Sequence, residues 1–343
     1  MATILHRLGL LRLCTTASTT IPCRLRSSVP NTTLPVVPPD AKDTQVDHLP
    51  NPNQTPGTCK IRKLHPREVS ILSGSQPVEG ARLRNDDLRL MYNADPNGFF
   101  LATTENGDVV GTIAAVCQSE TLGFIGFHHV ADAFQVEGAK LWETAMEYLG
   151  DRNVGIEVGT PDIGKYTELG FKEQWRTGCF KGTGIPLLPE VQSNKLLRPI
   201  ADIGYGRVVD FDTEICGVPR IKFLLSWLQN LGGPSGAAQA VLEGNRVIGF
   251  GVIRPLQAAS SHRIGPLLAE NAAATQVILL SLLSKIAKET LFIDSPLCNP
   301  SFTRILETDL KMEQVDERAR MYSRGNPGIE VQKMFGVLSK DIG

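Results

Sequence analysis

A pattern that occurs twice is the strongest constraint on the fold of this chain of 343 residues. The segment ATTENGDVVG, residues 102–111, matches AVLEGNRVIG, residues 240–249, at an offset of 138 residues. In both, Asn and Gly separate two apolar runs, and these residue types adopt the positive φ values of tight hairpin turns. At nearly the same offset, Ile125-Gly126 recurs as Ile264-Gly265. The chain is therefore predicted to contain two copies of one fold.

Each copy is predicted to run in the order helix, meandering strands, helix, strand, helix, strand. The expected fold class is α/β (mixed α+β), with two tandem domains, each a mixed, mostly antiparallel sheet flanked by helices. In the first copy a helix falls between the expected strands Phe124–Val130 and Val154–Gly159, and in the second copy a helix precedes the strand Leu291–Asp294. The positions that mark these helices are Leu141, Trp142, Ala145, Met146 and Leu149 in the first copy, and Val277, Leu280, Ser281 and Ser284 in the second.

The N-terminal segment has a different composition from the rest. Residues 1–39 contain no Asp or Glu, whereas Arg7, Arg12, Arg24 and Arg26 lie among Leu, Ser and Thr. This composition is typical of a mitochondrial transit peptide, assigned to residues 1–28, and predicts a protein of the mitochondrial matrix. A disordered basic tail on a cytoplasmic protein is the alternative.

Two further segments are predicted to be linkers. Residues 29–58 carry seven prolines and few apolar residues, so they are too poor in apolar surface to pack a core. Residues 186–198 lie in a second stretch in which Gly, Pro and polar residues replace the periodic apolar ones. The two domains are therefore expected at 59–185 and 199–343.

Charge and cysteine usage narrow the classes of partner. Without the four N-terminal arginines the formal net charge falls from −1 to −5, which argues against a nucleic-acid surface. No apolar run approaches the roughly 20 residues of a membrane span. The seven cysteines are scattered without a CxxC pair, which indicates reduced thiols and no zinc site. The expected partner is a small molecule, with no nucleic acid or membrane, and the chain is expected to be a monomer or homodimer.

Several further segments are informative as an ordered set. They are DPNGFFLATTENGDVVGTI (95–113), GFIG (123–126), LW (141–142), GDRNVGIEVG (150–159), YTELGF (166–171), IGPLLAE (264–270), and ARMYSRG with FGV (319–337). In this order they resemble the GNAT superfamily of N-acetyltransferases, and in particular its two-domain members with a second, C-terminal GNAT-like domain. The resemblance covers roughly residues 59–343, although no single motif is diagnostic.

The resemblance implies a CoA-dependent N-acetyltransferase or acyltransferase. An acyl group would pass from acetyl-CoA or another acyl-CoA to an amine of a small molecule or amino acid, by direct attack and without a metal. This chemistry needs amide groups at a helix N-terminus to hold the pyrophosphate and a donor for the thioester oxyanion. It also needs a base for the ammonium and an acid for the departing thiolate.

The family's pyrophosphate loop corresponds here to QVEGAK, residues 135–140. Lys140 stands where the family has a small residue, and Glu137 adds a negative charge, so a plain helix-entry loop is the alternative interpretation. The residues predicted to bind the cofactor are Val130, at the end of the preceding strand, and Gln135, Gly138, Ala139 and Lys140.

Three residues are candidates for catalysis. Tyr166 occupies the position of the family's general acid, and a phenol can donate a proton to a thiolate. His128 and His129 end the strand that meets the acyl group, and an imidazole can act as a base. Alternation along the strand allows at most one of them to face the cleft. The alternative for Tyr166 is an aromatic residue that only packs against the same helix, and the alternative for the histidines is a half-exposed strand position. Glu120 and Glu157 are rival bases.

The second copy is expected to bind no CoA. Ile305 lies opposite Tyr166 at an offset of 139, and the segment after IGPLLAE has no Gly-rich loop but a helix start with Asn271 as candidate N-cap. By the resemblance this copy covers the acceptor side, with Arg263, Asp294 and Tyr322 as candidate contacts for a small polar substrate. The alternative function for the whole chain is a non-catalytic GNAT-fold binding or regulatory protein with a degenerate CoA loop.

Overall fold

The computed structural model describes residues 59–75, 80–186, 196–286 and 288–343. The predicted transit peptide and the linker 29–58 lie outside the described residues, as does most of the linker 186–198. Within the described ranges, no helix has the length and apolar character needed to cross a bilayer.

The first copy contains the expected alternation of helices and strands. Two short helical elements lead into a meander of three strands, which is followed by a helix, a strand, a short helix and a long strand. The elements are β1 (Lys60–Lys63), a 3₁₀ helix (Pro66–Ser75), α1 (Asn85–Ala94), β2 (Phe99–Thr103), β3 (Val109–Cys117), β4 (Leu122–Val130), α2 (Gln135–Leu149), β5 (Asn153–Gly159), α3 (Ile163–Glu168) and β6 (Lys172–Thr183).

The second copy repeats this order and adds a short strand near its end. Its elements are β7 (Leu196–Pro199), α4 (Ile200–Ile203), α5 (Tyr205–Cys216), α6 (Ile221–Gln229), β8 (Ala237–Glu243), β9 (Arg246–Pro255), β10 (Ser261–Ala269), α7 (Ala272–Leu283), β11 (Thr290–Pro296), α8 (Pro300–Arg304) with a π turn (Ile305–Asp309), β12 (Glu313–Tyr322) and β13 (Met334–Gly336).

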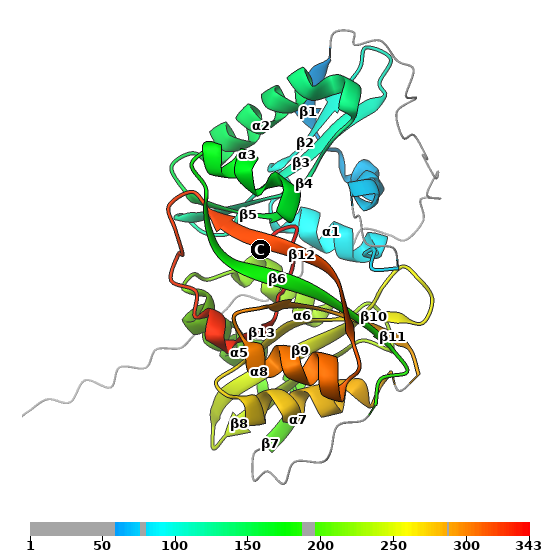
Figure 1. The fold of residues 1–343 in the computed structure, drawn as a ribbon, viewed down its shortest axis with the longest axis vertical. Coiled ribbons are helices and arrows are strands. Elements are labelled where there is room, and N and C mark those ends of the chain that lie inside the picture. The colour runs from blue at the N-terminus through cyan, green and yellow to red at the C-terminus, as the bar shows by residue number, and fades with distance from the viewer. Residues whose placement is uncertain (1–58, 76–79, 187–195, 287) are drawn as a thin grey trace, which may run out of the picture. The chain divides into compact units, whose positions relative to one another are not determined.

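The two copies share one mixed sheet because they exchange their last strands. The strand order is β1-β2-β3-β4-β5-β12-β6-β11-β10-β9-β8-β7, with β13 pairing to β10 outside this path. Thus β12, the last long strand of the second copy, pairs with β5, and β6, the last strand of the first copy, pairs with β11. The two exchanged strands run side by side between the copies (Figure 1). Pairing is antiparallel except for β4 with β5 and β10 with β11.

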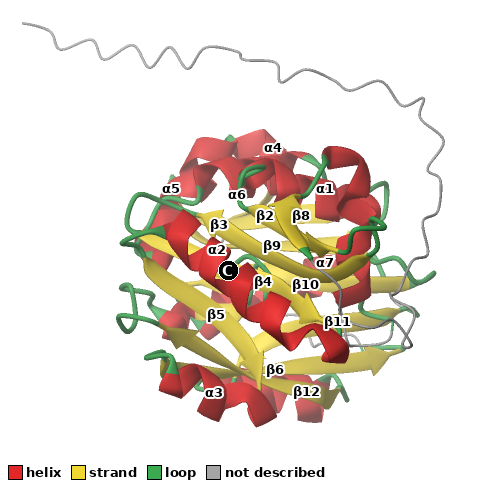
Figure 2. Cartoon of the chain, turned by 90° about the horizontal axis from the view of Figure 1, so that it is seen from above, coloured by secondary structure: helices red, strands yellow, loops and turns green. Residues whose placement is uncertain are grey.

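Helices cover both faces of this sheet. Leu141, Ala145 and Leu149 of α2 pack on the first copy, and Ile278 and Leu282 of α7 pack on the second. Figure 2 shows α1, α4, α5 and α6 gathered on one side of the strands. Apolar residues of α1, α5 and α6 form a common core with residues of β2, β4 and β9. That core belongs to both copies.

Both predicted hairpins are present. In the second copy, Gly244 and Asn245 join β8 to β9 as a two-residue turn, because Glu243 pairs with Arg246. In the first copy the turn is longer, since the amide of Thr104 donates to the Asp108 carbonyl, and Gly107 has a φ of 90°. Glycine therefore supplies the positive φ in each turn, as the repeat indicated.

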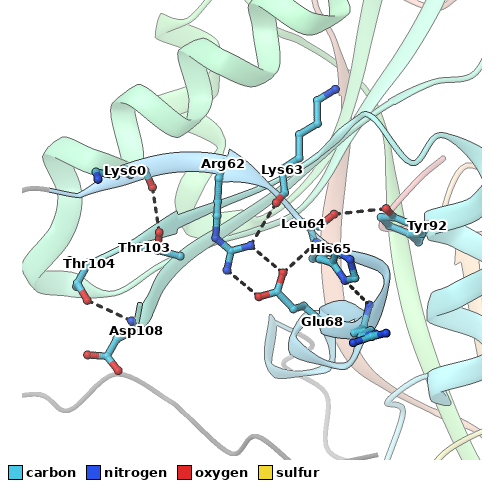
Figure 3. A network of polar contacts seen from close by, with 11 residues as sticks. Lys60, Arg62, Lys63, Leu64, His65, Glu68, Tyr92, Thr103, Thr104 and Asp108 are labelled. Carbon is cyan, nitrogen blue, oxygen red and sulfur yellow. Dashed lines mark hydrogen bonds and ion pairs between the residues drawn. The ribbon is translucent and has the colours of Figure 1, made fainter. Parts of the chain in front are cut away.

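Polar contacts hold β1 at the edge of the sheet (Figure 3). Arg62 donates two hydrogen bonds of 2.7 Å to the carboxylate of Glu68, which also accepts from the His65 amide at 2.9 Å. The Tyr92 hydroxyl of α1 donates to the Leu64 carbonyl at 3.4 Å. These contacts join β1, the 3₁₀ helix and α1.

Candidate active site

Strands β4 and β5 of the first copy separate partway along their length. They pair only from Leu122 with Asn153 to Ile125 with Ile156, although β4 continues to Val130. Phe127 has a φ of 48°, and the register between β3 and β4 shifts close by. Residues 126–130 therefore pair with β3 on one side and with no described strand on the other. Such an edge can accept an extended ligand through backbone hydrogen bonds.

The corresponding opening in the second copy is filled by the chain itself. Strands β10 and β11 also stop pairing early, at Ile264 with Ile293. Beyond this point β10 pairs with β13, where Leu267 lies opposite Gly336. At the offset of 139 residues, Leu267 corresponds to His128 of the first copy. Only the first copy thus has this strand edge open among the described residues.

The structure brings together two of the predicted catalytic residues. His128, near the end of β4, lies with its Nδ1 atom 3.1 Å from the hydroxyl oxygen of Tyr166, which α3 supplies. Trp142 of α2 contacts both, with ring centroids 5.6 Å from His128 and 5.4 Å from Tyr166. Phe171 completes this aromatic group. The Tyr166 side chain is buried, and its hydroxyl is held by His128.

Burial sets the protonation of this pair. It lowers the pKa of His128 to about 4, and the charges of Lys165 and His129 act in the same direction. It also raises the pKa of Tyr166 to about 12, with a smaller effect from Asp162. At neutral pH the imidazole is neutral and the phenol keeps its proton. The ordinary imidazole pKa that would make His128 an effective base therefore does not apply in this position.

The two neighbours of His128 on β4 are placed differently. His129 is exposed, as strand alternation predicts for the residue that follows a cleft-facing one. Val130 packs beneath α2, because a Cβ on Gly138 would lie 3.0 Å from the Val130 side chain. Gly138 thus allows α2 to approach β4 closely, which is a structural reason for a glycine there.

Residues 135–140 form the first turns of α2 rather than the expected loop. A single glycine followed by Ala139 and Lys140 favours helix, and a short 3₁₀ turn at Asp132–Phe134 already changes the chain direction. No side chain caps the start of α2. The amide groups of the first turn can therefore face an anion. Glu137 lies in that turn and opposes anion binding.

The equivalent helix of the second copy is capped. The Asn271 side chain accepts a hydrogen bond of 3.0 Å from the Ala274 amide, so the predicted N-cap is confirmed. A capped N-terminus offers fewer amide groups to a phosphate. The capped helix is therefore a second difference from the first copy, besides the filled strand edge.

The three predicted acceptor contacts lie between the copies. Arg263 of β10 forms an ion pair with Asp294 of β11, and both line a small cavity. Tyr322 of β12 is buried against Trp175, with ring centroids 5.9 Å apart, and lines a separate cavity. Two of the three residues are thus in contact with each other. Their role toward a substrate stays a prediction.

A buried ion pair lies where β4 and β5 separate, and the sequence did not predict this pair. Arg320 of β12 donates to the carboxylate of Glu157 on β5 at 2.7 Å and lies over the Phe124 ring at 4.7 Å. Glu157 lies on the face opposite α2, because its neighbours Ile156 and Val158 pack beneath α2. The strand exchange creates this pair, so the segment ARMYSRG alone gave no signal for it.

Comparisons with known proteins agree with this architecture. Residues 208–336, which span most of the second copy, match the family model of an acetyltransferase (GNAT) domain. A sequence relative is holothin acyltransferase of Pseudoalteromonas sp. (strain SANK 73390), 25% identical over 260 residues that cover 75% of this chain and 85% of that protein.

Solved structures show the same fold. A putative acetyltransferase from Pyrococcus horikoshii superimposes with a TM-score of 0.66 and 18% identity, covering 86% of this chain and 100% of that chain. A tandem GNAT protein from the clavulanic acid biosynthesis pathway gives a TM-score of 0.53 and 12% identity, covering 77% of this chain and 98% of that chain. The resemblance to two-domain GNAT proteins and the expected fold class are thus confirmed, and the comparisons support an acyltransferase.

Proposed function

We propose that the chain is a CoA-dependent N-acyltransferase that moves an acyl group from acetyl-CoA or another acyl-CoA to a small amine. The observation that carries the proposal is the open edge of β4, which ends beside the His128–Tyr166 contact. The second copy has neither the open edge nor the tyrosine, since β13 fills its edge and Ile305 stands opposite Tyr166. The first copy is therefore the catalytic one in this proposal.

The donor would be held by groups of α2 and β4. Amides in the first turn of α2, together with the side chains of Gln135 and Lys140, would bind the pyrophosphate. The backbone of residues 128–130 would pair with the extended arm of CoA. These groups fit the donor because the start of α2 is uncapped and this strand edge is open. An acyl-CoA bound there supplies an activated thioester.

Tyr166 is the general acid in this proposal. Its phenol, with a pKa of about 12, keeps its proton at neutral pH and can donate it to the departing sulfur. His128 orients that hydroxyl through the contact at 3.1 Å. Because burial lowers the pKa of His128 to about 4, His128 is a positioning residue here rather than the base.

Glu157 is the candidate base for the acceptor ammonium. It lies on the face of β5 opposite α2, whereas Tyr166 lies on the α2 side. A base on one side of the opening and an acid on the other suit direct attack, because the base takes a proton from the amine that adds to the thioester carbonyl, and the acid gives a proton to the sulfur that then leaves. The ion pair with Arg320 holds the Glu157 carboxylate in place.

Donor binding can be tested with a matched pair of variants. Val136 is the second residue of α2, and its side chain is 67% exposed, so substitution disturbs no packing. Val136→Glu places a carboxylate beside the proposed phosphate site, whereas Val136→Gln has the same shape without the charge. Calorimetric titration with acetyl-CoA should show binding to wild type and Val136→Gln and at least about tenfold weaker binding to Val136→Glu. Equal affinities would contradict the assigned site.

The alternative is a non-catalytic protein that keeps the fold. Two observations favour it: Glu137 in the first turn of α2, and the aromatic group of Trp142, Tyr166 and Phe171 packed between α2 and α3. Absence of acetyl-CoA and free CoA binding by the folded chain would favour this alternative. Saturable binding followed by turnover with any amine would exclude it.

The proposed location is the mitochondrial matrix, on the basis of the composition of residues 1–39. A reporter fused behind these residues should enter mitochondria. A cytosolic reporter would contradict the proposal.

A further inference from the structure

A groove of about 550 Å³ lies between α1 of the first copy and the loop 230–236, which follows α6 of the second copy. A volume of this size is typical of small-molecule sites. The helices α1 and α6 contact each other on the side of the sheet opposite α2, so the groove and the proposed donor site lie on different faces (Figure 2). The charged and large apolar side chains that line the groove are Arg84, Asp86, Arg89, Leu90, Leu231 and Arg254.

Arg254 of β9 lines the groove although its side chain is almost entirely buried. It pairs with Asp87 of α1, and the two side chains are 3% and 1% exposed. The Nε atom of Arg254 has no hydrogen-bond partner among the described residues. At the offset of 138 residues Arg254 corresponds to Val116, a match that the strand pairing supports, and Val116 is buried. The fold thus accepts an apolar residue here, and a buried ion pair is often no more stabilising than one. Stability alone does not explain Arg254.

The loop 230–236 holds two of the arginines in place. Arg84 donates a hydrogen bond of 2.6 Å to the Gly232 carbonyl, and Arg254 donates one of 3.0 Å to the Trp227 carbonyl at the end of α6. Gly232 and Gly233 have φ values of 77° and 118°, which favour glycine. A Cβ on Gly232 would lie 3.8 Å from the Nη2 atom of Arg254. The two guanidinium groups are therefore positioned by the protein itself, which lowers the entropic cost of binding a ligand.

The lining of the groove carries more positive than negative charge. Among the described residues that line it, three are arginines and one is an acid, Asp86, which lies 3.6 Å from Arg84. Asp87 offsets the charge of Arg254, so one positive charge remains in excess. Burial lowers the pKa of Arg254, and the charge of Arg84 acts in the same direction, whereas Asp87 opposes both. An anion close to Arg84 and Arg254 would reduce the repulsion between these two cations.

We propose that this groove binds a small organic anion, whose carboxylate or phosphate oxygens accept hydrogen bonds from Arg84 and lie beside Arg254. The Arg84 side chain is 37% exposed, and its guanidinium has N–H groups beyond the one that Gly232 accepts. The planar fork of a guanidinium fits such oxygens. Leu90 and Leu231 add an apolar wall, so a ligand with a short apolar part fits the groove. The inference does not rest on the proposed acyltransferase function.

Benzoate, phenyl phosphate and benzamide provide the test, because they share an aromatic ring and differ in the charge of the head group. Their binding to the full chain is measured by NMR titration at the indole N–H of Trp227, since the Arg254 guanidinium lies 3.9 Å from the centre of that ring. We expect benzoate or phenyl phosphate to bind saturably and at least about tenfold more tightly than benzamide. The tighter anion identifies the head group. Equal affinities for all three, or no binding of either anion, would overturn the inference.

Three substitutions locate the binding in the groove. Arg84→Gln keeps a donor for the Gly232 carbonyl but removes the charge, so the anion should bind about fivefold more weakly or worse. Asp86→Asn removes the opposing charge, so the anion should bind about threefold more tightly. Arg82→Gln is the control, because Arg82 is exposed and outside the lining, and it should leave the affinity unchanged.

Opposite effects of Arg84→Gln and Asp86→Asn are the signature of this site, and unchanged affinity in both would contradict it. The Asp86 side chain is 71% exposed, so Asp86→Asn disturbs no packing and decides the matter if Arg84→Gln fails to fold.

The outcomes separate this inference from the proposed function. Val136→Glu should weaken acetyl-CoA binding and leave binding of the anion unchanged, because the two sites lie on different faces of the sheet. Anion binding by a chain that does not bind acetyl-CoA would refute only the acyltransferase proposal. Normal acetyl-CoA binding without binding of either anion would refute only the inference.

Discussion

The His128–Tyr166 contact makes a prediction about the pH dependence of stability. The pKa of His128 falls from 6.5, the ordinary value, to about 4 in the folded chain. Between these values the unfolded chain binds a proton that the folded chain excludes, so the free energy of unfolding decreases as pH falls from 6.5 to about 4. Each pKa unit corresponds to about 1.4 kcal/mol, so the full difference is about 3 kcal/mol.

The perturbation is His128→Gln, because the glutamine amide can still form a hydrogen bond with the Tyr166 hydroxyl but does not titrate. Urea denaturation of the full chain is measured at several pH values from about 7 to about 4, with His129→Gln as the exposed control. The stability lost by the wild type on acidification should exceed that lost by His128→Gln by about 3 kcal/mol. The pKa of His262 is also lowered by burial, but His262 is present in every chain and its contribution cancels. Parallel stability curves for the wild type and His128→Gln would refute the reasoning.

Three further predictions follow from single contacts. Tyr166→Phe should lower kcat by about 100-fold or more with little change in the donor KM. An unchanged kcat would exclude Tyr166 as the general acid. Arg320→Met leaves Glu157 buried without its partner and should reduce the free energy of unfolding, measured by urea denaturation, by about 3 kcal/mol or more. The double variant that also carries Glu157→Gln should recover much of this loss. Asn271→Ala removes the cap of α7 and should cost about 1 kcal/mol in the same assay, whereas no change would show that the cap is not needed.

Local signals in the sequence predicted the elements well. The hairpins followed from Asn and Gly between apolar runs, and the buried face of α2 followed from its amphipathic spacing, with Leu141, Ala145 and Leu149 in the core. The second helix was predicted at the right place, but the positions that marked it do not show which residues it buries. Its buried residues include Ile278, Leu279 and Leu282 rather than the positions 277, 280, 281 and 284. A helix that is apolar on nearly all sides gives no pattern from which to choose a face.

The arrangement of the site depends on contacts that no local pattern encodes. Exchange of β6 and β12 changes which strands are neighbours without changing any strand, so the pair Arg320–Glu157 could not be predicted. The resemblance to a known family indicated His128 and Tyr166 separately, but only the packing of Trp142 beside them explains the burial that lowers the pKa of His128. The start of α2 at Gln135 was likewise decided by the preceding 3₁₀ turn.

The central claim is that the first copy binds an acyl-CoA and the second does not. The most direct measurement is the calorimetric stoichiometry of acetyl-CoA binding to the full chain, to Val136→Glu and to Ala273→Glu. Ala273 is exposed and is the second residue of α7, the place that Val136 holds in α2. The account predicts one molecule bound per chain, with binding weakened by Val136→Glu and unchanged by Ala273→Glu. Two molecules bound per chain, or weakening by Ala273→Glu alone, would contradict it.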